Sequence, residues 1–341
     1  MVTWYTNCYA IRNLYCNFKN YRKKLKLKKY LSEKEFLKLK ETFTSLLISE
    51  VKLIDKVIKY ISNSKGKMIR PCLVINTAKT IGNITEKNYL VASLVEMIHL
   101  ATLIHDDIVD ESDTRRGWPT PARLWKNKIA LLIGDYIFSK SLSTIVQLND
   151  LESIKVLSNA SDRLSKGEIF QIQESKNKIM SENSYFSMIK DKTASLFSAA
   201  CELSARASSK EKTDFKNFKK FGENFGIAYQ IKDDLNDVIS NSKILGKPTN
   251  LDVKRNTLTL PYIHCMYQLN SYERSKILKK INKLSKKNKY KEIQNILNDS
   301  KSIDYCNDKI NHYLRKAFDS INDYPNKKLL ISVTKSVFNE N

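Results

Sequence analysis

The sequence predicts an all-α fold: one large helical domain over residues 31–341, preceded by a basic extension over residues 1–30. Only eight Gly and six Pro occur in 341 residues, which is too few for a chain with many tight turns. From about Leu31 onward, apolar residues recur at spacings of three and four, the pattern of amphipathic helices. Strand-like alternation is too rare to build a sheet.

The helices can be placed in order by the residues that interrupt them. The first pattern, EFLKLKETFTSLLISEVKLIDKVIKYI (residues 35–61), stops where Gly66 and Pro71 break it. The segment 86–110 is apolar nearly all round, which predicts a buried helix. A loop rich in Gly and Pro follows at 111–125. Other helical patterns cover residues 71–82, 128–148, 151–178, 183–207, 213–240 and 258–270, followed by a lysine-rich helical tail.

The formal net charge of +23 suits a nucleic acid, a membrane surface or an anionic substrate. Much of this charge lies in the first 30 residues and in a lysine-rich stretch from Lys276 to Lys291. The middle of the chain, between these two regions, is mixed in charge. This distribution argues against a nucleic-acid partner, and we expect none.

The first 32 residues contain no Asp or Glu and are rich in Lys, Arg, Tyr and Asn. This composition is typical of an organelle transit peptide, with a basic disordered extension as the alternative. We expect an organelle location, in the mitochondrion rather than the plastid, and a cytoplasmic location remains open.

Cysteine and histidine give no metal-binding pattern. The six Cys are scattered without a CxxC pair, and the four His form no HExxH motif. Structural thiols in a reducing compartment are therefore expected. We count no apolar run long enough to span a bilayer.

A first cluster of carboxylates ends the apolar segment MIHLATLI (residues 97–104). Asp106 and Asp110 are four residues apart and share a helical face with His99. Stacked like charges destabilise a helix unless a cation lies between them. Mg²⁺ prefers oxygen ligands and often joins one or two carboxylates to substrate phosphates. A solvated acidic turn is the alternative, but the preceding apolar run favours a site at the rim of a buried helix.

A second cluster lies in AYQIKDDLNDV (residues 228–238). Gln230, Asp233, Asp234 and Asp237 are spaced at i, i+3, i+4 and i+7, so we expect all four on one helical face. One DDxxD motif is a weak signal, but two on separate core-like helices are a strong one. The simplest arrangement is a pair of helices that face each other across a cavity holding metal ions and an anion.

Basic residues near turns complete this pattern. Each would be an ordinary surface charge if it stood alone, but Arg and Lys beside Mg²⁺-binding carboxylates indicate a diphosphate site. The candidates are Lys67 and Arg70, Arg115 and Arg116, Lys192 with Thr193, and Lys247.

A diphosphate site with Mg²⁺ suits the ionisation of a diphosphate ester. When such an ester ionises, a carbocation and a departing diphosphate form, so the barrier is largely a matter of charge. Metal ions and Lys or Arg side chains stabilise the leaving group electrostatically. Apolar walls exclude the water that would quench the cation. No nucleophilic side chain is required.

With these residues in view, the chain resembles the trans-isoprenyl diphosphate synthases, most closely the medium- and long-chain polyprenyl diphosphate synthases of the octaprenyl and solanesyl type. The similarity runs in family order from about Leu31 to the tail. It passes through GKMIRP, EMIHLATLIHDDIVDESDTRRG, LIGDYIFSKS, KGEIFQI, KTASLFSAA, GIAYQIKDDLNDV and LGKPTNLDVKRNTLTLP.

The resemblance implies a fold, a reaction and a partner. The fold is a set of mostly antiparallel helices around a central cavity, usually in a homodimer. The reaction is the Mg²⁺-dependent head-to-tail condensation of isopentenyl diphosphate onto farnesyl or geranylgeranyl diphosphate.

The resemblance also implies residue roles. Three Mg²⁺ ions would be held by Asp106, Asp110 and Asp233, with Asp107, Asp234 and Asp237 in support. Isopentenyl diphosphate would bind at Lys67, Arg70, His99 and Arg116. The allylic diphosphate would contact Arg115, Lys192, Thr193, Gln230 and Lys247.

Three positions depart from the family pattern. Lys65 and Met68 stand where GGKRxRP has Gly and Arg, and Asn256 stands where Gly is usual before TLP. Lys67 and Arg70 remain, and Asn tolerates the left-handed conformation that Gly would adopt. We therefore expect an active enzyme.

Product length depends on the turn before Asp106. Ala101 and Thr102 lie there and neither is aromatic, whereas short-chain members of the family have bulky rings near these positions. We expect a long product of about seven to ten isoprene units, because no ring fills the space. Such a chain would serve a quinone and bring the protein to a membrane surface. The alternative is that Phe138 or Phe170 closes the cavity and gives a geranylgeranyl-type product.

Three rival interpretations fit less well. A class I terpene cyclase would usually replace the second DDxxD with an Asn/Ser/Glu-type metal motif. A non-catalytic subunit of a heteromeric synthase would tend to lose aspartates, and both clusters here are intact. A nucleic-acid-binding protein gives no reason for paired carboxylate helices.

Overall fold

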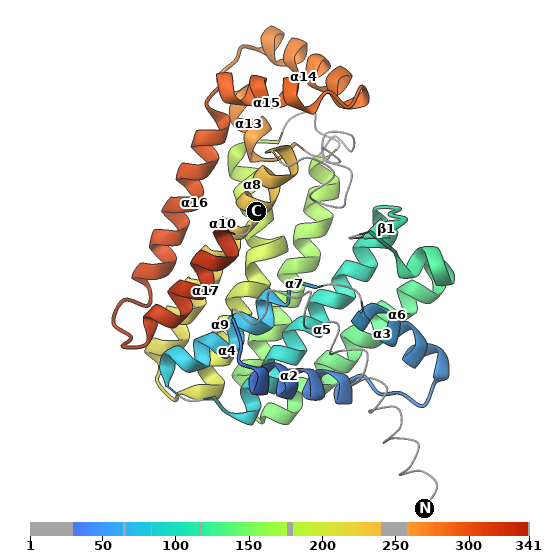
Figure 1. Ribbon diagram of the computed structural model, residues 1–341, viewed down its shortest axis with the longest axis vertical. Coiled ribbons are helices and arrows are strands. Elements are labelled where there is room, and N and C mark those ends of the chain that lie inside the picture. Colours follow the sequence, from blue (N-terminus) through green and yellow to red (C-terminus); the bar gives the residue numbers. More distant parts are fainter. Residues whose placement is uncertain are drawn as a thin grey trace, which may run out of the picture.

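The computed structural model describes residues 30–63, 66–82, 84–115, 117–175, 180–239 and 258–339. Within these ranges the chain is a bundle of long helices packed side by side (Figure 1). The one sheet in the described part is a two-residue antiparallel hairpin of β1 (Thr114–Arg115) and β2 (Trp118–Pro119). The all-α prediction is confirmed.

The helices follow the expected order, and most bounds differ by a few residues. They are α2 (Glu33–Leu46), α3 (Lys52–Asn63), α4 (Ile69–Ile81), α5 (Glu86–Val109), α6 (Pro121–Ile145), α7 (Leu151–Glu174), α8 (Glu182–Ile189), α9 (Ser195–Ser208), α10 (Lys212–Ile239), α13 (Leu260–Tyr267), α14 (Ser271–Lys286), α15 (Tyr290–Asp299), α16 (Ser302–Asp319) and α17 (Lys327–Asn339). The exception among the bounds is α6, which begins at Pro121 inside the segment expected as a loop, seven residues before the predicted start.

Side chains at the helix starts explain several of these bounds. The Thr120 hydroxyl accepts the N–H of Arg123 at the start of α6, where Pro121 needs no hydrogen-bond partner. Asp150 accepts two N–H groups at the start of α7. Asn270 and Glu273 form a reciprocal capping box at the start of α14.

The helix predicted over residues 35–61 is divided into α2 and α3. The Ser49 N–H donates to the Asp55 carboxylate, and the Val51 N–H donates to the Ser49 hydroxyl. Local side chains thus satisfy backbone groups before α3 begins and favour a break in the helix. The break lets α3 leave the line of α2 and pack against α6.

The helix predicted over residues 183–207 is also interrupted. Between α8 and α9, residues Lys190–Ala194 form a π-helical turn, which we call the π turn. A Cβ added to Gly167 of α7 would lie 2.5 Å from the Lys192 nitrogen, and one added to Gly226 of α10 would lie 2.6 Å from the Ala194 Cα. Two glycines therefore let α7 and α10 close on this turn. Such turns occur frequently at functional sites.

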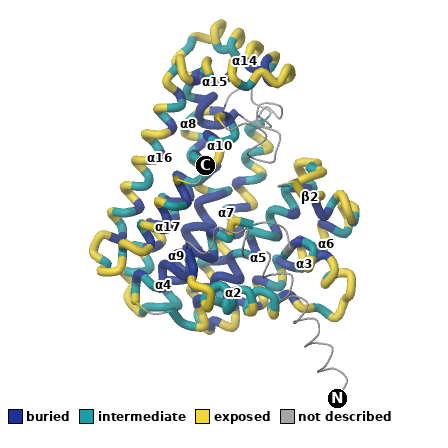
Figure 2. The backbone as a smooth tube through the Cα atoms, in the orientation of Figure 1, coloured by how far each residue is buried: buried dark blue, intermediate teal, exposed yellow. Residues whose placement is uncertain are grey.

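The buried side chains form a large cluster and a smaller one, and α5 contributes to both. Leu94 and Ile98 of α5 belong to the large cluster, while Met97 and Ala101 belong to the smaller one with α3 and α6. Figure 2 shows α5 buried or partly buried along most of its length. Packing on two sides explains why this segment is apolar nearly all round.

Two described helices, α5 and α6, are long and apolar enough to cross a membrane by length and composition. This corrects the sequence prediction, which counted uninterrupted apolar runs and so stopped at isolated charges such as Glu96. In the most apolar window, 61% of the residues of α5 and 39% of those of α6 are buried inside the structure. Burial in a protein core accounts for the composition of α5.

Close packing of α9 on α10 gives a stability prediction. A Cβ added to Gly222 would overlap the Phe197 carbonyl oxygen and lie 2.8 Å from the Ser198 Cα, both of them backbone atoms. Gly222→Ala should therefore destabilise the protein by about 1–3 kcal/mol, measured by urea unfolding. Gly134→Ala is the matched control, because the three atoms nearest to a Cβ there all belong to the His105 ring, a side chain that can move, and not to the backbone. The control should be near neutral or gain about 1 kcal/mol from helix propensity. If the free energy of unfolding fell by the same amount in Gly222→Ala and Gly134→Ala, this interpretation would be contradicted.

Candidate active site

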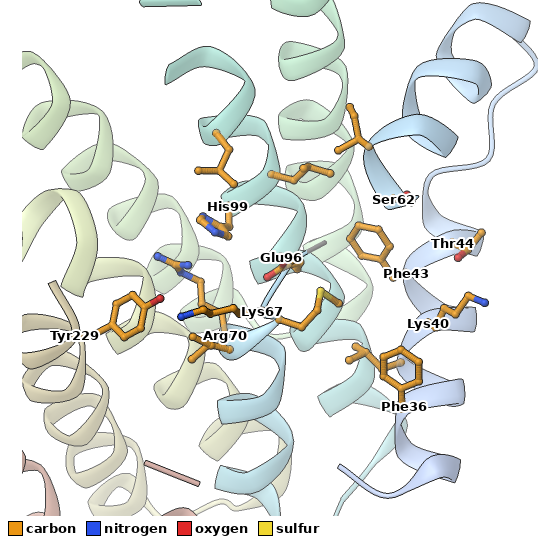
Figure 3. Close-up of a pocket in the computed structure, with 17 residues that line it drawn as sticks. Phe36, Lys40, Phe43, Thr44, Ser62, Lys67, Arg70, Glu96, His99 and Tyr229 are labelled. Atoms are coloured by element: carbon orange, nitrogen blue, oxygen red, sulfur yellow. The ribbon is translucent and has the colours of Figure 1, made fainter. Parts of the chain in front are cut away.

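A cavity of about 130 Å³ lies where α2, the start of α4, α5 and α10 meet (Figure 3). Its wall contains Lys67, Arg70 and His99, three of the residues that the sequence assigns to one diphosphate. The Arg70 guanidinium lies 4.2 Å from the centroid of the buried Phe197 ring, a cation–π contact that orients it. The structure thus gathers three of the four predicted residues, and Arg116 lies outside the described part of the chain.

Met68, one of the departures from the family pattern, has a left-handed backbone with φ 49° and ψ 33°. This conformation is uncommon for a residue other than Gly. It ends the short loop before α4, so that Lys67 is exposed at the cavity while Arg70 lies on the first turn of α4. The Met68 side chain lines the same cavity.

Lys40 of α2 lines this cavity as well, and sequence reasoning missed it. Burial lowers the pKa of its ammonium group to about 8. The sequence did indicate that Lys40 faces the protein interior. It lies four residues after Phe36 and three before Phe43, on the apolar face of its helix.

The first carboxylate cluster ends α5. Asp106 is half-buried on the last turn, and Asp110 is exposed at the C-cap, where its N–H donates to the Asp106 carbonyl. Asp107 is buried and accepts a hydrogen bond of 2.8 Å from Nε of Arg115. Negative side chains at a helix carboxyl end oppose the helix dipole, so a cation is needed to stabilise the cluster.

Asp106 is in the least favourable electrostatic position of the cluster. Burial raises the pKa of its carboxyl to about 7, and the negative charge of Glu168 on α7 adds to the effect. The positive charges of Lys192 and Arg115 act in the opposite direction. Asp106 therefore shares its surroundings with a second acid and two cations that belong to other elements.

Lys192 lies on the π turn and reaches α7. Its ammonium donates to Glu168 Oε2 and to Gln171 Oε1, both at 2.8 Å. Sequence reasoning gave Glu168 and Gln171 no role, although both lie in the quoted segment KGEIFQI. Their spacing of three residues on one helix face was the available signal.

The second cluster is held by a chain of short hydrogen bonds. The buried Tyr185 hydroxyl donates to Asp234 at 2.6 Å, and Gln230 Nε2 donates to the other Asp234 oxygen at 2.7 Å. Thr193 of the π turn donates to Gln230 Oε1 at 2.7 Å. This chain fixes the Gln230 amide and joins α10 to the π turn.

The sequence predicted that Gln230, Asp233, Asp234 and Asp237 of α10 share one helical face. In the structure, these side chains differ in how far they are exposed. Asp233 is exposed and Asp237 is half-buried, whereas Asp234 is 6% exposed and occupied by its two donors. Adjacent helical residues point about 100° apart, so each DD pair sends one carboxylate toward the core.

The donors that are present fit Mg²⁺. Asp106, Asp110 and Asp233 offer only oxygen ligands, and the raised pKa of Asp106 shows a carboxylate whose charge is not fully compensated by its neighbours. The described residues contain no group of three His, Cys, Asp or Glu close enough to hold an ion by themselves. Mg²⁺ commonly keeps several waters and binds one or two carboxylates plus substrate phosphates, which suits a pair such as Asp106 and Asp110. Lys247 lies outside the described residues, as do Lys65 and Asn256.

Comparisons with known proteins identify the family of the chain. Residues 51–300 match the family model described as Polyprenyl synthetase. The chain is 31% identical over 306 residues to octaprenyl diphosphate synthase of Haemophilus influenzae, covering 89% of this chain and 93% of that protein. It is 32% identical over 277 residues to heptaprenyl diphosphate synthase component 2 of Bacillus subtilis, covering 81% of this chain and 79% of that protein.

The fold is similar to that of a solved polyprenyl synthase from Caulobacter crescentus, complexed with calcium and isoprenyl diphosphate. The TM-score is 0.82 and the sequence identity is 25%, over 90% of this chain and 94% of that chain.

The environment of Asp106 gives a pH-dependent prediction. Its pKa in the folded protein, about 7, is above its ordinary value of 3.8, so the folded state binds this proton more tightly than the unfolded state. The associated stability is present at low pH and is lost as the pH rises toward 7. Without divalent cations, Asp106→Asn should exceed the wild type in melting temperature, and the difference should be larger at pH 8 than at pH 5, because the loss begins above pH 3.8.

Asp107→Asn is the control for this measurement. It removes the carboxylate that pairs with Arg115 and should cost about 2 kcal/mol at both pH values. If Asp106→Asn melted below the wild type at pH 8, the raised pKa of Asp106 would be refuted.

Proposed function

This chain belongs to the polyprenyl synthetase family, and from that premise we propose that it condenses isopentenyl diphosphate head-to-tail onto farnesyl or geranylgeranyl diphosphate to make a long-chain all-trans polyprenyl diphosphate. Its activity is that of a trans-prenyltransferase. The observation that carries the proposal is that a cavity lined by Lys67, Arg70 and His99 borders α5 and α10, the two helices that bear the carboxylate clusters.

In the proposed reaction, the allylic C–O bond breaks and its electron pair leaves with the diphosphate. The isopentenyl double bond then attacks the allylic carbon, and the proton lost from the new chain passes to the departing diphosphate. Lys192 and Thr193 hold the leaving diphosphate, with Gln230 fixed beside them by Asp234. Lys67, Arg70 and His99 hold the second diphosphate so that its double bond faces the cation.

We propose that Asp106, Asp110 and Asp233 hold three Mg²⁺ ions. When bound, Mg²⁺ supplies positive charge that offsets the charge developing on the departing diphosphate. The similar Caulobacter structure is complexed with calcium, which supports the use of a divalent cation by this protein. Asp107 and Asp234 act through Arg115 and Gln230, because both carboxylates are already hydrogen-bonded inside the protein.

Product length depends on what borders the growing chain before Asp106. Ala101 is fully buried in the smaller cluster, so Thr102 is the residue of this pair that is left to border the product. Phe138 packs against both core clusters, and Phe170 lines a separate hollow between α7 and α8. The absence of an aromatic ring at 102 and the similarity to an octaprenyl diphosphate synthase favour a long product over a geranylgeranyl-type one.

A homodimer is proposed from the exposed side of α6. Four apolar side chains on this side are between 37% and 56% exposed, namely those of Leu131, Leu132, Leu142 and Val146. Such a concentration of apolar side chains is unusual on a protein surface that faces water. A second copy of the chain would cover them. The similarity to a heptaprenyl synthase component also supports a heteromeric assembly as the alternative, although both aspartate clusters are intact here.

A quinone side chain is the proposed use of the product, and a mitochondrial location is the proposed setting. Residues 1–29, on which the targeting interpretation depends, lie outside the described part of the chain.

The test is to size the products made from labelled isopentenyl diphosphate with farnesyl or geranylgeranyl diphosphate and Mg²⁺. The wild type should release chains of about seven to ten units, and Thr102→Phe should shorten them because a ring blocks the path beside α5. Thr102→Val, which adds no bulk, should leave the length unchanged. If the wild type added only one isoprene unit to the primer, the long-chain proposal would be refuted. If it elongated neither primer, the proposed reaction itself would be refuted.

A further inference from the structure

The lysine-rich stretch noted in the sequence is a single face of α14. At about 100° per residue, Lys276, Lys279, Lys280 and Lys283 fall within an arc of about 100°. All four are exposed, while Ile281 on the opposite side is buried against the rest of the protein. Figure 2 shows the outer turns of α14 exposed. We call these four lysines the lysine face.

The lysine face differs from other exposed lysines of the described structure. Lys155 pairs with Glu152 at 2.7 Å and Lys166 with Asp162 at 2.8 Å, each within one helix turn. Within the described residues, the four lysines of this face have no carboxylate partner. The single acid of α14, Glu273, caps the first turn by accepting the Asn270 N–H. The face therefore presents uncompensated positive charge.

Two exposed aromatic side chains lie next to the lysine face. Tyr272 is 77% exposed and precedes Lys276 by four residues on the same side of α14, and Tyr267, at the end of α13, is 74% exposed. Tyrosine combines an apolar ring with a polar hydroxyl, and it is enriched where protein meets the boundary between lipid and water. Lys side chains can lay their apolar stems on such a surface while the ammonium groups meet phosphates.

The lysine face is mechanically tied to the end of α10. Helix α14 packs on α15, where Gln294 donates to the carbonyls of Val238 and Ile239 at 3.0 and 2.8 Å. These are the last two residues of α10, directly after Asp237. Figure 1 shows α14 and α15 together at the upper end of the molecule. A surface bound to the lysine face therefore lies at the same end as the second carboxylate cluster.

We propose that the lysine face of α14, flanked by Tyr267 and Tyr272, docks the protein on an anionic lipid bilayer. Charge complementarity to headgroup phosphates supports this occupant. The choice of a bilayer rather than a nucleic acid rests on the proposed long-chain product, which is apolar and needs a lipid phase. Arg274, the one Arg of α14, donates instead to the carbonyls of Leu269 and Tyr267.

The test is co-sedimentation of the full chain with vesicles of phosphatidylcholine containing 30% phosphatidylglycerol, compared with pure phosphatidylcholine. The wild type should bind only the anionic vesicles. The variant Lys276→Gln, Lys280→Gln, Lys283→Gln should lose affinity by roughly a hundredfold.

The matched control is Lys212→Gln, Lys216→Gln, Lys220→Gln, which removes the same charge from exposed positions at the start of α10. The length of this helix, 28 residues, places them roughly 30 to 40 Å from its other end. The control should bind vesicles as the wild type does, and both variants should elongate prenyl chains normally in detergent.

Three results would overturn the proposal. The first is that the wild type binds no vesicles, and the second is that the two triple variants lose the same amount of vesicle affinity. The third is that the wild type binds a duplex DNA oligonucleotide more tightly than it binds the vesicles. If the wild type elongated no prenyl chain, the proposed function would be refuted instead. Vesicle binding and chain elongation are measured separately, so failure of the docking proposal can be told from failure of the proposed function.

Discussion

The partial burial of Asp106 beside other carboxylates, at the carboxyl end of α5, is the constraint on which the rest of the site depends. Asp106 is half-buried near Glu168 and Asp110, at the end of a helix whose dipole is already negative. Folding this arrangement is favourable only if positive charge is supplied from other elements. Arg115 supplies part of it from the hairpin by pairing with Asp107, and Lys192 supplies part of it from the π turn. A bound divalent cation with its diphosphate would complete the balance.

The π turn follows from this requirement. Lys192 must reach both Glu168 of α7 and the surroundings of Asp106, while Thr193, the next residue, must meet Gln230 of α10. A turn wedged between two helices can do this only if both approach closely, and Gly167 and Gly226 remove the side chains that would prevent it. Packing, rather than a catalytic side chain acting alone, thus sets the geometry of the leaving-group site.

The sequence predicted the helices and the two acidic clusters because both depend on local spacing. It did not separate the members of each cluster, since burial of Asp107 and Asp234 depends on Arg115 and Tyr185, which lie elsewhere in the chain. The π turn was missed for the same reason: KDKTA is an ordinary helical sequence, and its extra residue is imposed by packing. By contrast, the break between α2 and α3 has local causes in Ser49 and Asp55 that could have been recognised.

The central claim is that a divalent cation replaces a proton on Asp106, and proton release on binding tests it most directly. Calorimetric titration of the full chain with Mg²⁺ at pH 6.5, in two buffers of different ionisation enthalpy, measures the protons released per protein. Because the pKa of Asp106 is about 7, the wild type should release a large fraction of one proton, and Asp106→Asn should release close to none. Binding of Mg²⁺ by the wild type without proton release, or equal release by Asp106→Asn, would contradict the account.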